Sequence, residues 1–146
     1  MNYNLKMNKV MKRVFVLFAF CVVALMQLDA QVYKLKTTSM AFRSYDGYSW
    51  SDWSAWDYDR GSNILVVINA NSDIITIYSK ETQEYDILNL IEDEKQDPKG
   101  GVYSEWLCVD RNGLRCHFRL RKQRDDTLQL YIDYSDFSFV YNVISR

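Results

Sequence analysis

The chain has 146 residues, with 18 Lys and Arg against 19 Asp and Glu and a hydrophobic content of 48%. This length permits one domain with its own core, and the hydrophobic content excludes a disordered chain. The near-zero net charge excludes a strongly basic nucleic-acid binder. One His and three Cys leave little material for a zinc site, so neither a metal nor a cofactor is expected.

The first thirty residues have the pattern of a secretory signal peptide. Four basic residues precede an apolar run of thirteen residues, 14–26, and Leu28 and Ala30 occupy the −3 and −1 positions of a cleavage site before Gln31. A helix of this length spans about 20 Å, less than the roughly 30 Å hydrocarbon core, so no retained membrane span is expected; a retained anchor is the alternative. The sequence predicts an exported protein that is periplasmic, surface-bound or secreted.

The residues from 31 to 146 are predicted to form a single all-β domain. They hold 14 basic and 18 acidic residues. Alternating apolar residues and β-branched or aromatic runs recur about every ten residues. Strands are expected at 32–42, 53–59, 63–70, 74–80, 84–91, 102–110, 114–122, 127–134 and 137–144. One long loop is expected at 92–101. The remaining connections are short turns, which indicates an antiparallel meander.

Three hairpins each have one register that collects apolar residues on one face. The turn Arg111-Asn112-Gly113 suits a type I turn followed by a glycine bulge. The three registers predict these pairs: Ile68 with Ile75, Trp106 with Phe118, and Ile132 with Phe139. Eight or nine such strands predict a small closed or partly open barrel of lipocalin-like type, with a two-sheet sandwich as the alternative.

The register of the second hairpin places Cys108 opposite Cys116, the two cysteines that remain after cleavage. Export would place them in an oxidising compartment, so a structural disulfide is expected. The alternative is a pair of buried free thiols on the inner face.

Arg115, His117, Arg119 and Arg121 alternate with apolar residues and are expected on the outer face of one strand. Such a row can hold an anionic ligand or the carboxylates of a partner. The alternative is a solvated face balanced by acids, since the register puts Glu105 opposite Arg119. The lone His without a nearby nucleophile is weak support for catalysis.

The segment 44–60, SYDGYSWSDWSAWDYDR, is the most unusual stretch of the chain. Flat aromatic faces beside acidic groups suit stacking on sugar rings or gripping a peptide. The candidate recognition residues are Tyr48, Trp50, Trp53, Trp56 and Tyr58. The alternative is that one or two of the tryptophans close the end of the barrel. The spacing of the acids does not match a calcium-binding loop.

A Lys-rich leader ending in Ala-Gln is followed by VYKLKTTS, W-x₂-W-x₂-W, IYSKETQEYDI and CVDRNGLRCHFRL. With these motifs the chain resembles small exported β-rich proteins of unknown function from Bacteroidota, over most of residues 11–146. The resemblance implies export and a compact β fold. It carries over no activity and no functional residue.

No phosphate-binding loop, nucleophile elbow or metalloprotease helix is present in the sequence, so the protein is expected not to be an enzyme. The first hypothesis is an exported binding module that contacts a glycan or a protein through the Trp/Tyr/Asp-rich surface. The alternative is a lipocalin-like carrier of a small apolar ligand, and a small secreted enzyme is a third, disfavoured class. Large inner-face side chains filling the interior would argue against the carrier. Burial of all three tryptophans of the segment would argue against the binding surface.

Overall fold

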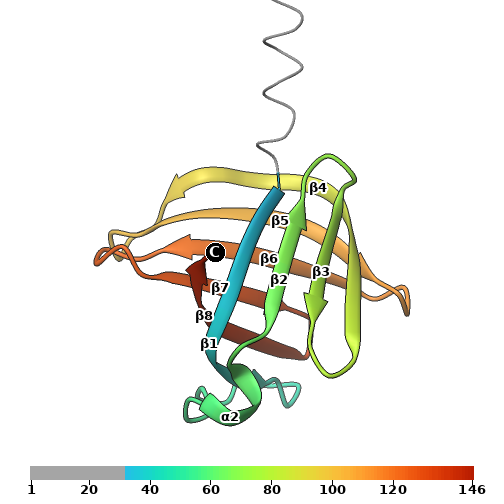
Figure 1. Cartoon of the computed structure of the whole chain (residues 1–146). Coiled ribbons are helices and arrows are strands. Elements are labelled where there is room, and N and C mark those ends of the chain that lie inside the picture. The colour runs from blue at the N-terminus through green and yellow to red at the C-terminus, as the bar shows by residue number, and fades with distance from the viewer. Residues whose placement is uncertain (1–31) are drawn as a thin grey trace, which may run out of the picture. The chain divides into compact units, whose positions relative to one another are not determined.

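A computed structural model describes residues 32–146, and the predicted leader at 1–30 lies outside the described residues. Eight antiparallel strands close in sequence order into a barrel (Figure 1), which confirms the expected fold class. The strands are β1 (Val32–Ser44), β2 (Leu65–Asn69), β3 (Ile74–Tyr78), β4 (Thr82–Gln96), β5 (Val102–Asp110), β6 (Arg115–Lys122), β7 (Leu128–Asp133) and β8 (Phe137–Ser145). The short helix α2 (Tyr58–Gly61) lies between β1 and β2.

The two longest strands, β1 and β4, each pair with different neighbours along their length. β1 pairs with β2 through its first residues and with β8 through its later ones, and its register shifts between Thr37 and Ser39. β4 pairs with β3 over 82–86, and its register against β5 shifts three times beyond Ile87. Bulges of this kind bend strands and increase their twist. β2 and β3 consequently cross β5, β6 and β7 at a large angle (Figure 1).

Apolar side chains fill the interior of the barrel. Phe118, Leu130 and Ile132 are at most 2% exposed, and the ring of Phe118 packs edge-on against Tyr85 with centroids 4.7 Å apart. The expected pairs of all three hairpins are present, so one face of each strand points inward as the alternation predicts.

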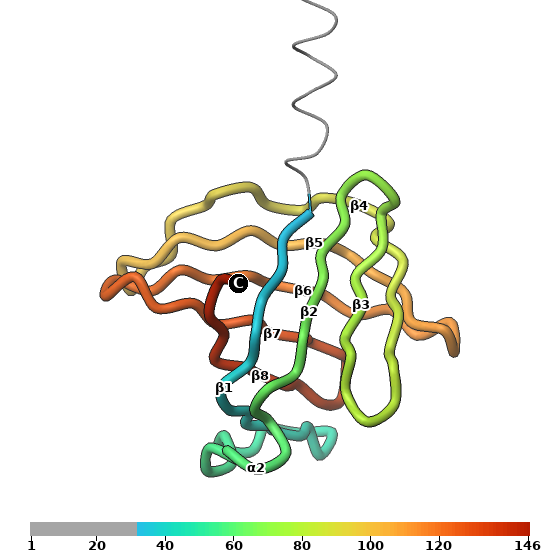
Figure 2. The backbone as a smooth tube through the Cα atoms, in the orientation of Figure 1, coloured from blue at the N-terminus to red at the C-terminus, as the bar shows by residue number. Residues whose placement is uncertain are grey.

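The expected strand at 53–59 is wrong. Residues 45–57 form a loop that runs beside β1 at one end of the barrel, next to α2 (Figure 2). The backbone N–H of every third residue donates to a carbonyl of β1: Ser51 to Ser44, Ser54 to Phe42, and Asp57 to Met40. The loop therefore advances three residues for every two residues of β1, which no regular ladder does.

The loop expected at 92–101 is shorter in the structure. β4 continues to Gln96, so only residues 97–101 connect it to β5. The acidic stretch stays in the strand through irregular pairing with β5, and Glu94 takes a left-handed φ of 47°.

Candidate functional site

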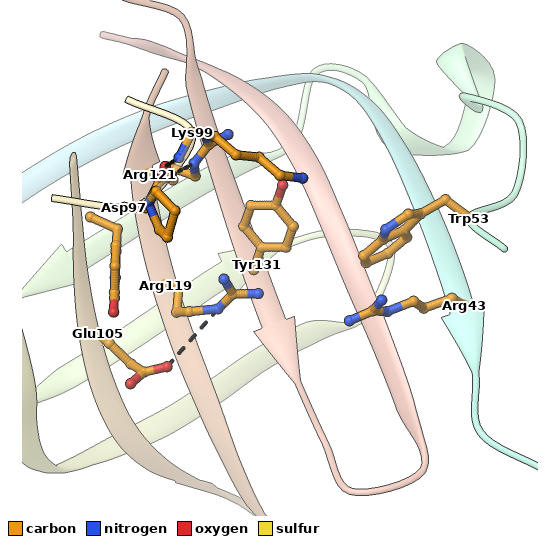
Figure 3. Close-up of a pocket in the computed structure, with 10 residues that line it drawn as sticks. Arg43, Trp53, Asp97, Lys99, Glu105, Arg119, Arg121 and Tyr131 are labelled. Atoms are coloured by element: carbon orange, nitrogen blue, oxygen red, sulfur yellow. Dashed lines mark hydrogen bonds and ion pairs between the residues drawn. The ribbon is translucent and has the colours of Figure 1, made fainter. Parts of the chain in front are cut away.

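A groove of about 510 Å³ lies on the outer face of β5, β6 and β7. Arg119 and Arg121 point outward there because the alternate residues of β6, Phe118 and Leu120, belong to the interior. The connection after β4 forms one wall, and the end of β1 with its following loop forms the other (Figure 3). The lining residues are Arg43, Trp53, Asp97, Pro98, Lys99, Tyr103, Glu105, Arg119, Arg121 and Tyr131.

Asp97 ties the first wall to the floor of the groove. Its carboxylate accepts a hydrogen bond from Nε of Arg121 and further ones from the backbone N–H of Lys99 (2.7 Å) and Gly101 (3.2 Å). The side chains of Arg121 and Asp97 are only 14% and 15% exposed. The hydrogen bond from Arg121 is the main cause that lowers the pKa of Asp97 to about 2. The wall is thus anchored by a fully ionised pair at neutral pH.

Arg119 is held in the middle of the floor by two acids and a ring. Its Nε donates to Oδ2 of Asp133 at 2.8 Å and lies 3.9 Å from Oε1 of Glu105. Its guanidinium carbon lies 4.4 Å from the centre of the Tyr131 ring. The expected pairing of Glu105 with Arg119 is confirmed, and the charge of this arginine is compensated locally.

Arg43 has aromatic neighbours but no anionic one. Its guanidinium carbon lies 4.7 Å from the ring centre of Trp50 and 4.6 Å from that of Trp53, within range of cation–π attraction. Its Nε is buried without a hydrogen-bond partner. Within the described part of the chain, no carboxylate forms an ion pair with it. Figure 3 shows its guanidinium pointing toward Arg119 and Tyr131 across the groove.

A second hollow of about 290 Å³ shares two lining residues with the groove, Trp53 and Tyr131. Their rings meet edge to face with centroids 6.0 Å apart. Trp56 and Gln129 are among the other residues that line this hollow. The two hollows adjoin at Trp53 and Tyr131, and aromatic side chains line both.

The structure brings together only part of the predicted site. Trp53, Arg119 and Arg121 line the groove, Trp56 lines the second hollow, and Trp50 contributes through Arg43. Trp50 and Trp56 are each 38% exposed, so the three tryptophans are not all buried.

Three other candidates line neither hollow: Tyr48, which is 94% exposed, Tyr58 and Arg115. Nδ1 of His117 lies 3.8 Å from Oε1 of Glu105, on the same outer face.

Sequence reasoning missed several lining residues, namely Arg43, Lys99, Tyr103 and Tyr131. The signal for Arg43 was present, because Ser39, Ala41 and Arg43 continue the alternation of β1 by one residue beyond the expected strand end. Lys99 lies in a connection, for which alternation gives no direction.

Cys108 and Cys116 face each other as expected, but both are buried free thiols, so the expected disulfide is not formed in the structure. The backbone bond from Asp110 N to Leu114 O sets the phase of this hairpin and makes Cys108 and Cys116 a hydrogen-bonded pair. Side chains of such pairs lie farther apart than those of the alternate pairs. Burial raises the pKa of both thiols to about 12.

Over residues 32–146, no group of three or more His, Cys, Asp or Glu is arranged to hold a metal ion. The same residues include no helix that is long and apolar enough to cross a membrane. Comparisons with protein-family models, with curated proteins and with solved structures gave no match to this chain.

Proposed function

We propose that the protein is an exported, non-enzymatic binding module that holds a glycan chain in the outer-face groove. One observation carries the proposal. Trp53, from the loop after β1, and Arg119 and Arg121, from β6, are far apart in sequence but line one groove. The aromatic segment 44–60 and the row of arginines on β6 thus contribute to the same groove.

The groove favours a glycan over a protein partner. Its floor strands are hydrogen-bonded to neighbours on both sides, so their backbone groups are not free to pair with an extended peptide. Recognition must therefore come from side chains. Aromatic rings beside guanidinium and carboxylate groups match the apolar faces and hydroxyl groups of sugar rings.

The packed interior weighs against the alternative of a carrier. A carrier needs an internal cavity for its ligand. The inward positions of β6 and β7 are instead occupied by Phe118, Leu130 and Ile132, which pack in one cluster.

A general acid of a hydrolase needs a pKa near the working pH. The pKa of Asp97 is lowered to about 2, so this carboxylate does not supply a proton at neutral pH. Asp133 and Glu105 both lie against Arg119. The ionised state of Asp97 supports binding rather than general-acid catalysis by this residue.

Electrophoresis through gels that contain dissolved polysaccharides tests the proposal. Retardation of the protein by at least one polysaccharide is expected, and Trp53→Ala should weaken it by at least about fivefold because the ring contacts are lost. Tyr58→Ala is the matched control, since Tyr58 is exposed and lies outside both hollows. Equal retardation of the two variants, or no retardation by any polysaccharide, would show that the groove does not bind glycans.

A further inference from the structure

We infer that the groove selects a glycan that carries carboxylate groups, such as a polyuronate, and that Arg43 and Lys99 are the groups that bind these anions. The inference rests on the proposed function and specifies its ligand. It starts from the balance of charge along the groove.

The groove is positive on a domain that is otherwise negative. Four cationic side chains line it, Arg43, Lys99, Arg119 and Arg121, against two lining carboxylates, Asp97 and Glu105, and a third beside Arg119, that of Asp133. Residues 31–146 as a whole carry 14 basic and 18 acidic side chains. A local excess of the opposite sign to the whole domain attracts anionic ligands to that place.

The excess is located on two residues. Arg121 is paired with Asp97, and Arg119 is paired with both Asp133 and Glu105. Among the described residues, neither Arg43 nor Lys99 forms an ion pair. Both therefore remain available to an anion from outside the chain.

The side chain of Arg43 is held in an orientation that suits binding of an anion. The rings of Trp50 and Trp53 fix the plane of its guanidinium, and its buried Nε finds no acceptor within the protein. Since the buried Nε is out of a ligand's reach, an arriving anion binds the terminal nitrogens, whose charge no ion pair among the described residues neutralises. The terminal nitrogens point into the groove (Figure 3), where a planar carboxylate can accept two parallel hydrogen bonds.

A polyuronate matches this arrangement better than an acidic peptide. Each of its sugar rings presents an apolar face and a carboxylate, so Trp53 and Tyr131 can pack on rings while Arg43 and Lys99 bind the acid groups. A peptide would bring carboxylates but would leave its amide groups against strands that are already paired.

Isothermal titration with polygalacturonate and with its carboxyl-reduced, neutral counterpart tests the inference, because the two polymers share a backbone. Arg43→Gln should weaken binding of polygalacturonate by about tenfold more than it weakens binding of the neutral polymer. Arg115→Gln removes the same charge from β6 outside the groove and should change binding by less than about twofold. Binding of polygalacturonate should also weaken in 1 M salt, where the Debye length is about 3 Å.

Lys99→Gln is a second test that remains valid if Arg43→Gln does not fold, because Lys99 lies outside the loop 45–57. A loss of about threefold for the acidic polymer is expected from it. Equal affinity for both polymers, with a loss in Trp53→Ala and none in Arg43→Gln, would overturn the inference and leave the proposed function intact. Binding of poly-glutamate in preference to polygalacturonate, with the same dependence on Arg43, would overturn the choice of a glycan. No binding of any of the three polymers would overturn the inference together with a glycan function in this groove.

Discussion

Asp97 connects two parts of the groove through one carboxylate, and its pKa makes that connection dependent on pH. The pKa lies near 2 in the folded protein, below the ordinary value of 3.8. Folding therefore favours the ionised form. The resulting stabilisation is complete above the ordinary pKa and is lost as the pH falls through the folded value.

We predict that Asp97→Asn lowers the urea midpoint at neutral pH. The difference between the variant and the original protein should then shrink as the pH falls from about 4 to about 2. Asp52→Asn is the control, because Asp52 is exposed and forms no ion pair with the described residues. A difference that stays constant down to pH 2 would contradict the assigned role of Asp97.

The two cysteines give a second prediction for single residues. Cys108 and Cys116 are 0% and 1% exposed, and burial raises the pKa of each thiol to about 12. Since the thiolate is the reactive form, neither should react with a maleimide in the folded protein. Both should react in denaturant without reductant, and mass spectrometry of the chain that begins at Gln31 would show two added labels. Two sulfurs that stay unlabelled in denaturant would be bonded to each other, against the free thiols of the structure.

At the scale of elements, the hydrogen bonds of the loop 45–57 account for the three-residue spacing of its tryptophans. Trp-Ser, Trp-Ser and Trp-Asp follow one another at a spacing of three, and the second residue of each pair bonds to β1. The loop thereby covers the edge of β1 that β2 leaves unpaired. An unpaired strand edge can pair with a strand of another chain, so this cover protects β1 from such pairing. The aromatic composition favours a strand, but the spacing of three does not match the period of two.

The candidate site was predictable to the extent that it depends on local alternation. The outward direction of Arg119 and Arg121 follows from the period of β6 alone. Their meeting with Trp53 depends on how a loop folds back over distant strands, which no local pattern encodes. Arg43 was missed only because the expected strand ended at residue 42, one residue before it.

Helix α2 packs against β1 at a glycine, and this contact gives a prediction for the element. A Cβ at Gly61 would lie 2.3 Å from the backbone nitrogen of Met40 and 2.7 Å from its Cβ. The nearest atom belongs to the backbone of β1, so the strand or the helix must move. Gly61→Ala should therefore lower the free energy of unfolding by about 3 kcal/mol, the upper part of the range for overpacking.

Chemical denaturation of Gly61→Ala and of Gly113→Ala measures this effect. A Cβ at Gly113, in the turn between β5 and β6, meets nothing within 4 Å, although its φ of 82° makes that substitution strained for a different reason. Only Gly61→Ala should also disturb the neighbouring loop, which tryptophan fluorescence reports. Unchanged fluorescence and stability in Gly61→Ala would mean that α2 does not press on β1.

At the scale of the whole molecule, the barrel was predictable because its neighbours in sequence are neighbours in space. Each hairpin register follows from a turn and from apolar alternation on two adjacent strands. The bends that close the barrel are different. The register shifts near Thr37 in β1 and beyond Ile87 in β4 bend these two strands. They have no signature in the residues themselves, so the end of β4 was expected at 91 but lies at Gln96.

The last prediction concerns the residues before the barrel. β1 begins at Val32, directly after the predicted cleavage site, so removal of residues 1–30 would leave all eight strands in place. Protein recovered from the extracytoplasmic fraction should therefore have a denatured mass that begins at Gln31. It should also unfold in one cooperative transition, because the interior cluster draws on strands from β1 to β8. A full-length mass in that fraction would contradict the signal peptide and favour a retained anchor. A mass beginning at Gln31 would establish that the groove faces an extracytoplasmic compartment, as binding of an extracellular glycan requires.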